Sequence, residues 1–105
     1  MTAKTRKQQI EEMLALDPDD SFLRYGLAME HASAGDDGPA AALLLELTRR
    51  DPDYVPAYLM AGQALARLGR DDEAVAILKT GIAAATRKGN DHAAGEMAGL
   101  LESLG

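Results

Sequence analysis

The sequence predicts an all-α protein of about six helices, in which antiparallel helix pairs stack within a single domain. Two observations support this fold class. The phrase Asp-Pro-Asp begins at Asp17 and again at Asp51, so the same helix-ending segment occurs twice, 34 residues apart. The hydrophobic residues, 47% of the chain, are mostly Ala and Leu, with one Phe, three Tyr and no Trp. That usage favours helices, because Ala and straight-chain residues lose little conformational freedom in a helix.

Other positions repeat at the same distance. Gly35 and Asp37 recur as Gly69 and Asp71, and several Ala and Leu positions also coincide. Two helices of about fourteen residues with short turns fill such a unit, and one pair cannot bury its own apolar face, so pairs must stack. We therefore divide the single domain, residues 1–105, into an N-terminal half-repeat helix (5–16), two repeat-length units (17–50 and 51–84) and a C-terminal capping region (85–105).

The first expected helix, residues 5–16, resembles the second helix of a unit. Its end, IEEMLALDPDD, aligns with LLELTRRDPDY at the end of the first unit, which places Met13 over Leu47. This segment is therefore interpreted as half a unit.

Each full unit is expected to contain a Pro-containing turn, a helix, a tight turn and a second helix. In the second unit, apolar residues at three-and-four spacing share one face of the first helix. They are Tyr58, Ala61, Gly62, Leu65 and Leu68. Gly69 then ends this helix, and the acidic residues 71–73 begin the next helix, where the dipole favours negative charge.

The C-terminal region is expected to form one more helix at residues 90–104. The 34-residue shift places Ala85 to Lys88 where the Asp-Pro-Asp phrase would recur, so the third unit is incomplete. Apolar residues at helical spacing enable this helix to cap the stack. They are Ala93, Met97, Leu100, Leu101 and Leu104.

Together these residues resemble the tetratricopeptide repeat family. Its 34-residue pattern has a small residue at position eight, Gly or Ala before the turn, Ala at position twenty, a large apolar residue at position twenty-four and Pro at position thirty-two. The matching residues are Ala28 and Gly62, Gly35 and Gly69, Ala40 and Ala74, Leu44 and Leu78, and Pro18 and Pro52.

The chain departs from that pattern at several positions. The usual aromatic residue of position four is Tyr58 in the second unit but Arg24 in the first, where the neighbouring Tyr25 is expected to substitute for it. Position twenty-seven is Leu47 in the first unit and Gly81 in the second. These departures concern local packing and leave the predicted fold unchanged.

The resemblance implies a scaffold for contact between proteins, in which the first helices of the units line a concave groove for an extended peptide or a partner helix. The implied groove residues are Phe22, Tyr25, Met29, Ser33, Pro56, Leu59, Gln63, Arg67, Ala93 and Met97. Independently of the family, Phe22, Tyr25 and Met29 share one helix face, and an apolar face outside a core usually marks an interaction site. The alternative is that these residues pack beneath a terminal helix.

A carboxylate clamp of the kind that some members use for a chaperone's C-terminus is not expected. The resemblance places Lys and Asn at the clamp positions, whereas Tyr25 and Met29 stand at the first such pair here.

Charge and composition disfavour several other function classes. A net charge of −6 argues against nucleic acid and anionic membranes, which require a basic face. Without cysteine there is no disulfide, thiolate nucleophile or cysteine zinc site, and neither a His pair at metal-binding spacing nor a phosphate loop occurs. No apolar run approaches the ~20 residues of a membrane span. We therefore expect a cytoplasmic protein that is not an enzyme and has no metal or cofactor.

Two functions remain after these exclusions. The first is a non-catalytic adaptor that binds a partner peptide or helix in the groove. The alternative is a structural module that forms a homodimer through the apolar face of the last helix, from Met97 to Leu104.

Overall fold

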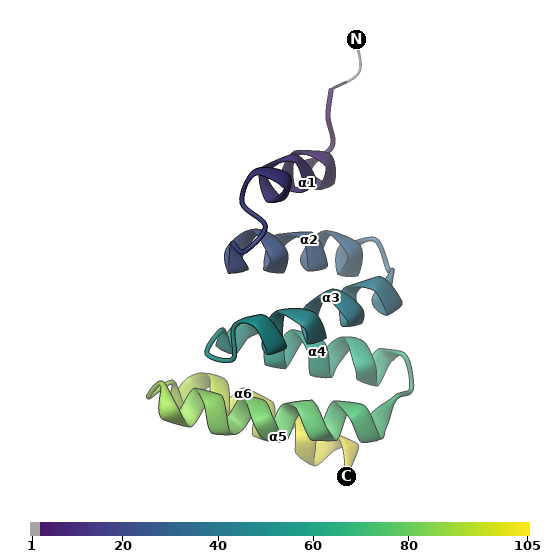
Figure 1. The fold of residues 1–105 in the computed structure, drawn as a ribbon. Coiled ribbons are helices and arrows are strands. Elements are labelled where there is room, and N and C mark those ends of the chain that lie inside the picture. The colour runs from purple at the N-terminus through teal and green to yellow at the C-terminus, as the bar shows by residue number, and fades with distance from the viewer. Residues whose placement is uncertain (1–2) are drawn as a thin grey trace.

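This computed structural model describes residues 3–105, which contain six helices joined by short turns. They are α1 (Arg6–Leu16), α2 (Ser21–Ser33), α3 (Asp37–Arg50), α4 (Val55–Arg67), α5 (Asp71–Arg87) and α6 (Asp91–Leu104). Each helix packs against the next, and together they form layers from the N-terminal to the C-terminal end (Figure 1). The stack measures 50 × 28 × 20 Å. The predicted all-α stack of helix pairs is confirmed.

The Asp-Pro-Asp phrase forms the turns before α2 and α4. In the first, the Asp20 N–H donates to the Asp17 carbonyl at 3.2 Å, and in the second the Tyr54 N–H donates to the Asp51 carbonyl at 3.0 Å. Pro disfavours helical backbone at the residue before it, so α1 and α3 end there. The Asp20 carboxylate then caps α2 by accepting the Leu23 N–H at 2.9 Å.

Glycine forms the other three turns. Gly35, Gly69 and Gly89 all have positive φ, between 71° and 81°, which only glycine adopts without strain. In each turn, the N–H after the glycine donates to the carbonyl five residues earlier at 2.8–2.9 Å, the bond that closes a helix C-terminus.

The C-terminal region does not keep the 34-residue spacing of the two full units. Without an Asp-Pro-Asp phrase to end it, α5 continues to Arg87 and has 17 residues, whereas α3 has 14. The capping region was expected to begin at residue 85, but this position lies inside α5. The expected helix at residues 90–104 is confirmed as α6.

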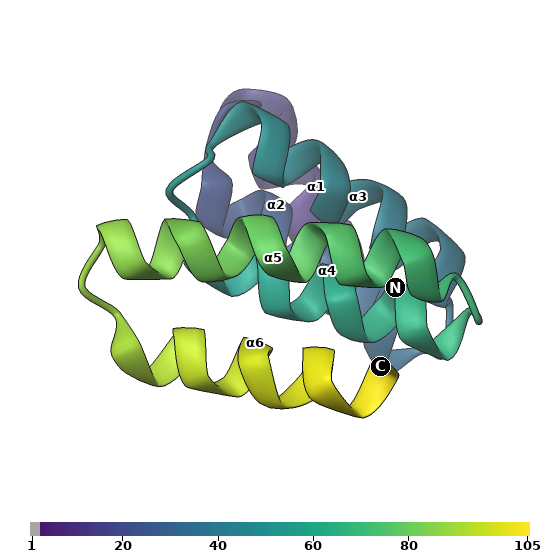
Figure 2. The same cartoon turned by 90° about the horizontal axis from the view of Figure 1, so that it is seen from below.

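The core runs through the stack as a series of buried Ala and Leu side chains. Ala28 packs with Leu44 and Leu47 between α2 and α3, while Tyr58 and Leu78 are buried between α4 and α5. Each fully buried large side chain contributes about 1.5–3 kcal/mol relative to exposure. Viewed from below, α6 lies beside α4 and α5 (Figure 2), and it packs against both. It therefore closes the C-terminal end of the stack.

Two further structural properties bear on function. In residues 3–105, no helix combines the length and apolar character that crossing a membrane requires. The same residues contain no group of three or more His, Cys, Asp or Glu side chains arranged to hold a metal ion.

Candidate partner-binding face

The four groove residues predicted on α2 lie together. Phe22, Tyr25, Met29 and Ser33 line one open hollow of about 320 Å³, because residues three, four and seven apart share a helix face. Gly26 and Glu30 of α2 and Arg6 of α1 complete its lining. We call this set of residues the α2 hollow.

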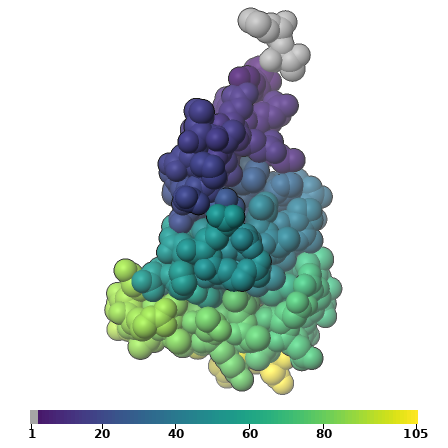
Figure 3. All heavy atoms as spheres, in the orientation of Figure 1, coloured from purple at the N-terminus to yellow at the C-terminus, as the bar shows by residue number. Residues whose placement is uncertain are grey.

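The apolar side chains of the α2 hollow remain accessible. Phe22 is 73% exposed, and Tyr25 and Met29 are half-buried. The hollow lies near the N-terminal end, where the molecule narrows in the space-filling view (Figure 3). Phe22 is thus not covered by a terminal helix, which was the alternative for these residues.

Tyr25 is held in place by an aromatic neighbour. Its ring lies 5.6 Å from the Tyr54 ring, centroid to centroid, at an interplanar angle of 55°, a tilted arrangement that aromatic pairs favour. Burial raises the pKa of the Tyr25 phenol. Burial also raises the pKa of the Tyr54 phenol, and the electrostatic effect of the nearby Tyr25, Asp20 and Asp51 raises it further. Both hydroxyl groups are therefore neutral near pH 7 and can donate hydrogen bonds.

An ion pair crosses the rim of the α2 hollow. Arg6 of α1 lies 3.0 Å from Glu30 of α2, with the Arg6 side chain 82% exposed and the Glu30 side chain 25% exposed. Sequence reasoning missed both residues, because their proximity depends on how α1 packs against α2. The pair leaves the rim without net charge.

The predicted groove residues of α4 do not line the α2 hollow. Leu59 packs partly against the core between α4, α5 and α6. Gln63 is half-buried, and Pro56 is exposed. Arg67 forms an ion pair with Asp37 at 2.9 Å. These four residues remain predictions, and the hollow is built from α2 and α1.

The prediction that Met97 lines the groove is wrong. Its side chain is fully buried, and its sulfur would lie 2.6 Å from a Cβ built on Gly81. Ala93 packs against the same part of the core. The physical reason is the register: α5 is three residues longer than α3, so the 34-residue shift does not carry over to α6.

The same packing removes the apolar face that was expected to support a homodimer. Besides Met97, the residues Leu100, Leu101 and Leu104 are half-buried against the core of the stack. The apolar stripe of α6 therefore caps its own chain.

The sequence is similar to those of several repeat proteins. The TPR repeat-containing protein PA0015 of Pseudomonas aeruginosa is 33% identical over 95 residues, which are 90% of this chain and 90% of that protein. A solution structure of a tetratricopeptide repeat domain protein from Salinibacter ruber has 36% identity and a TM-score of 0.77, covering 83% of this chain and 88% of that one. No family model matches the sequence.

Two further solved structures share the fold. Protein BPP2914 of Bordetella parapertussis has 26% identity and a TM-score of 0.83, covering 97% of this chain and 89% of that one. The TPR2B domain of yeast Sti1, in its complex with pHsp70, has a TM-score of 0.87 and covers 93% of this chain and 78% of that one. Its identity of 20% shows the likeness of fold alone.

Proposed function

Since the chain belongs to the tetratricopeptide repeat family, we propose that it is a non-catalytic interaction module that binds a peptide or helix of a partner protein in the α2 hollow. The observation that carries this proposal is the convergence of Phe22, Tyr25 and Met29 on one open hollow of about 320 Å³. Tyr, Phe and Met are enriched at protein interfaces.

The chemistry of the hollow favours an apolar side chain of the partner. Phe22 and Tyr25 offer ring surface, and the thioether of Met29 adapts to different shapes. Burial of one large apolar side chain there would contribute about 1.5–3 kcal/mol to binding. The neutral Tyr25 hydroxyl and the exposed Ser33 hydroxyl at the other end are available to the polar backbone of the partner segment.

The same residues argue against a ligand that is recognised by its terminal carboxylate. Tyr25 and Met29 occupy the positions at which a carboxylate clamp would use Lys and Asn. Neither Lys nor Asn lines the α2 hollow, and its one cation, Arg6, lies at the rim on α1 beside Glu30. Binding by apolar contact is therefore expected to depend only weakly on salt.

Affinity capture from a lysate of the source organism would test the proposal, followed by calorimetry with peptides of each captured protein. The wild type would be compared with Met29→Glu, which places a charge in the hollow. Leu16→Glu is the matched control, because Leu16 is 89% exposed and does not line the hollow. We expect peptide affinity to fall more than about tenfold in Met29→Glu and to stay unchanged in Leu16→Glu. Equal affinity for all three proteins would contradict binding in the α2 hollow.

A further inference from the structure

Most of the large apolar side chains that are exposed in the described residues lie at the N-terminal end of the stack. Within residues 3–105, four large apolar side chains are exposed: Met13 (46%), Leu16 (89%), Phe22 (73%) and Leu68 (39%). The first three lie on α1 or at the start of α2. We call Met13, Leu16 and Phe22 the N-terminal apolar face. Exposed apolar surface of this kind usually has a partner.

A second hollow lies beside this face. It measures about 200 Å³ and lies between α1 and α2, with Ile10 and Met13 on one side and Phe22 and Leu23 on the other. Phe22 also borders the α2 hollow, so its ring stands between the two. The face thus has a protruding aromatic side chain next to an apolar hollow. Such a surface can fit a second copy of itself.

The charges on α1 have the order that a two-fold pairing requires. Arg6 and Met13 are seven residues apart and lie on one stripe of α1. Asp17 follows directly as the residue that caps the C-terminus of this helix. Lys4, Arg6 and Lys7 make the beginning of α1 basic. In the acidic turn that follows its end, Asp19 pairs with Arg50 at 3.4 Å and Asp20 caps α2, which leaves the exposed Asp17 to face a second copy. Two α1 helices that lie antiparallel would bring the basic end of each against the acidic end of the other.

The other charges permit this arrangement. Glu12, near the middle of α1, is neutralised by Lys4 at 2.7 Å. The Arg6 guanidinium has five N–H donors, and because its side chain is 82% exposed, it can keep Glu30 and also bind a second carboxylate. Asp17 is exposed at the C-terminal end of α1.

Continuation of the stack by a further helix pair is disfavoured at this end. Arg6 and Lys7 stand 34 residues before Ala40 and Ala41, which are fully buried in α3. A helix packed on α1 as α2 packs on α3 would bury two cations, which is costly without partners. The end therefore favours a face-to-face pair over a growing array.

We propose that the occupant of the N-terminal apolar face is a second copy of this chain. The two copies are related by a two-fold axis, with the α1 helices antiparallel, Met13 and Phe22 near the axis and Arg6 of each copy against Asp17 of the other. The two α1–α2 hairpins then form a four-helix assembly. The proposed dimer face adjoins the α2 hollow, and Arg6, Phe22 and Gly26 border both. Met13, Leu16 and Asp17 belong to the dimer face alone.

Sedimentation equilibrium on the full chain would test the dimer. We expect the average mass to rise with concentration from 11.1 kDa toward twice that value. Met13→Glu places a carboxylate near the axis and should raise the dissociation constant more than about tenfold. Leu68→Glu, at the exposed large apolar side chain that lies outside this face, is the control and should leave the dissociation constant unchanged. Circular dichroism would confirm that both variants fold.

Charge reversal would test the antiparallel register. Arg6→Asp and Asp17→Arg should each weaken self-association by roughly fivefold or more, since two attractive pairs become two repulsive ones. An equimolar mixture of these two variants should dimerise more tightly than either alone, because both pairs across the mixed dimer are then attractive. The doubly reversed chain should dimerise about as well as the wild type.

The remaining results would overturn the proposal. A mass of 11.1 kDa at millimolar concentration would show that no second copy binds. A dimer that Met13→Glu does not weaken would place the interface elsewhere, and a mixture no tighter than its components would exclude the antiparallel register. Loss of peptide binding in Met29→Glu is measured separately, so each of the two proposals can fail without the other.

Discussion

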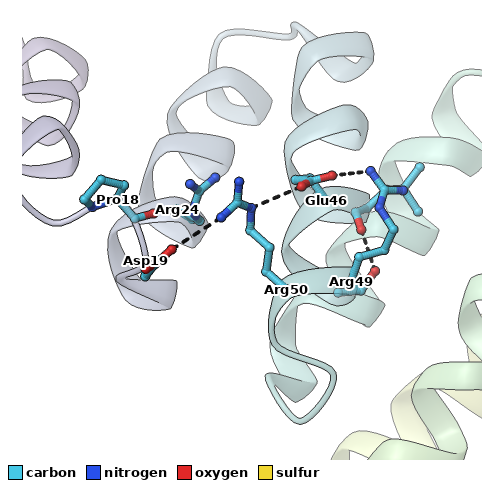
Figure 4. Close-up of polar contacts among 8 residues, drawn as sticks. Pro18, Asp19, Arg24, Glu46, Arg49 and Arg50 are labelled. Atoms are coloured by element: carbon cyan, nitrogen blue, oxygen red, sulfur yellow. Dashed lines mark hydrogen bonds and ion pairs between the residues drawn. The ribbon is translucent and has the colours of Figure 1, made fainter.

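The two full units make the same hydrogen bond with different chemistry. In the first unit, the Arg24 Nε donates to the Pro18 carbonyl at 2.6 Å (Figure 4). In the second, the Tyr58 hydroxyl donates to the Pro52 carbonyl at 2.7 Å. Donor and acceptor are displaced by 34 residues in both cases. The repeat therefore preserves a donor to the turn carbonyl, but the two donors differ in burial: Tyr58 is buried and Arg24 is half-buried.

Burial differs because the second helices of the units differ at position twenty-seven. In the second unit this residue is Gly81, and the space beside it is filled by Tyr58, which is only 2% exposed, and by Met97. In the first unit it is Leu47, which fills the core itself, while Arg24 stays half-buried. Where position twenty-seven of the second helix holds a large residue, the residue at position four of the first helix is therefore less buried.

The ends of the second helices show the same contrast in their charges. In the first unit, Arg50 lies 3.4 Å from Asp19 and 3.1 Å from Glu46, which Arg49 also contacts (Figure 4). In the second, Arg87 lies 3.3 Å from Asp53, and the residue that corresponds to Glu46 is Thr80. In both units, an arginine at the end of the second helix pairs with an aspartate of the Asp-Pro-Asp turn at the start of the unit. Only the first unit adds a carboxylate of the second helix itself, Glu46.

The largest effect is expected when the residues at position four are exchanged. Tyr58→Arg should lower the free energy of unfolding by about 3–5 kcal/mol, because it empties a buried site or buries an unpaired charge. Arg24→Tyr should change it by less than about 1 kcal/mol, since the site is only half-buried. Urea denaturation measures both. Similar losses would show that the shared hydrogen bond, and not the packing, determines how much position four contributes to stability.

A smaller effect is expected at position twenty-seven of the second unit. A Cβ on Gly81 would lie 2.4 Å from the Tyr58 Cβ and 2.6 Å from the Met97 sulfur, so Gly81→Ala should cost about 1–3 kcal/mol of unfolding free energy by overpacking. Gly95→Ala in α6 is the control: its Cβ meets nothing within 4 Å, and it should stabilise by up to about 1 kcal/mol. Both are measured by denaturant titration. Equal stabilisation by the two substitutions would exclude the close approach at Gly81.

The smallest effect is expected at the exposed charges of α3. Hydrogen bonds from Arg49 and Arg50 lower the pKa of Glu46 below its ordinary 4.5. A lowered folded-state pKa means that the stabilisation is present above pH 4.5 and is lost as the pH falls through the lower value. In an NMR titration, Arg49→Gln should raise the pKa of Glu46 toward 4.5, and added salt should act in the same direction. An unchanged pKa in this variant would contradict the role of Arg49.

Turn chemistry explains why most of the helix boundaries could be predicted. Pro18 and Pro52 end helices by local sterics, and Gly35 and Gly69 end them by adopting positive φ. The spacing of Phe22, Tyr25 and Met29 likewise fixes a shared helix face without any knowledge of neighbours. These properties depend on residues within one or two helical turns, so the sequence contains all the information that they need.

The residues that sequence reasoning misplaced depend on contacts between distant segments. The repeat alignment put Met97 in the groove, but three additional residues in α5 shift α6, and Met97 enters the core beside Tyr58 and Gly81. Arg6 reached the α2 hollow because α1 packs across α2 near Glu30. Neither contact leaves a periodic signal along the chain.

By itself, the sequence determined where most of the helices begin and end, that they stack in pairs and which apolar residues of α2 share a face. Local backbone preferences and side-chain periodicity are sufficient for those properties. Only the tertiary structure decided which side chains are buried and which remain open. Burial depends on how closely two helices approach, and that distance is set by matching volumes across the interface, such as Gly81 against Tyr58 and Met97.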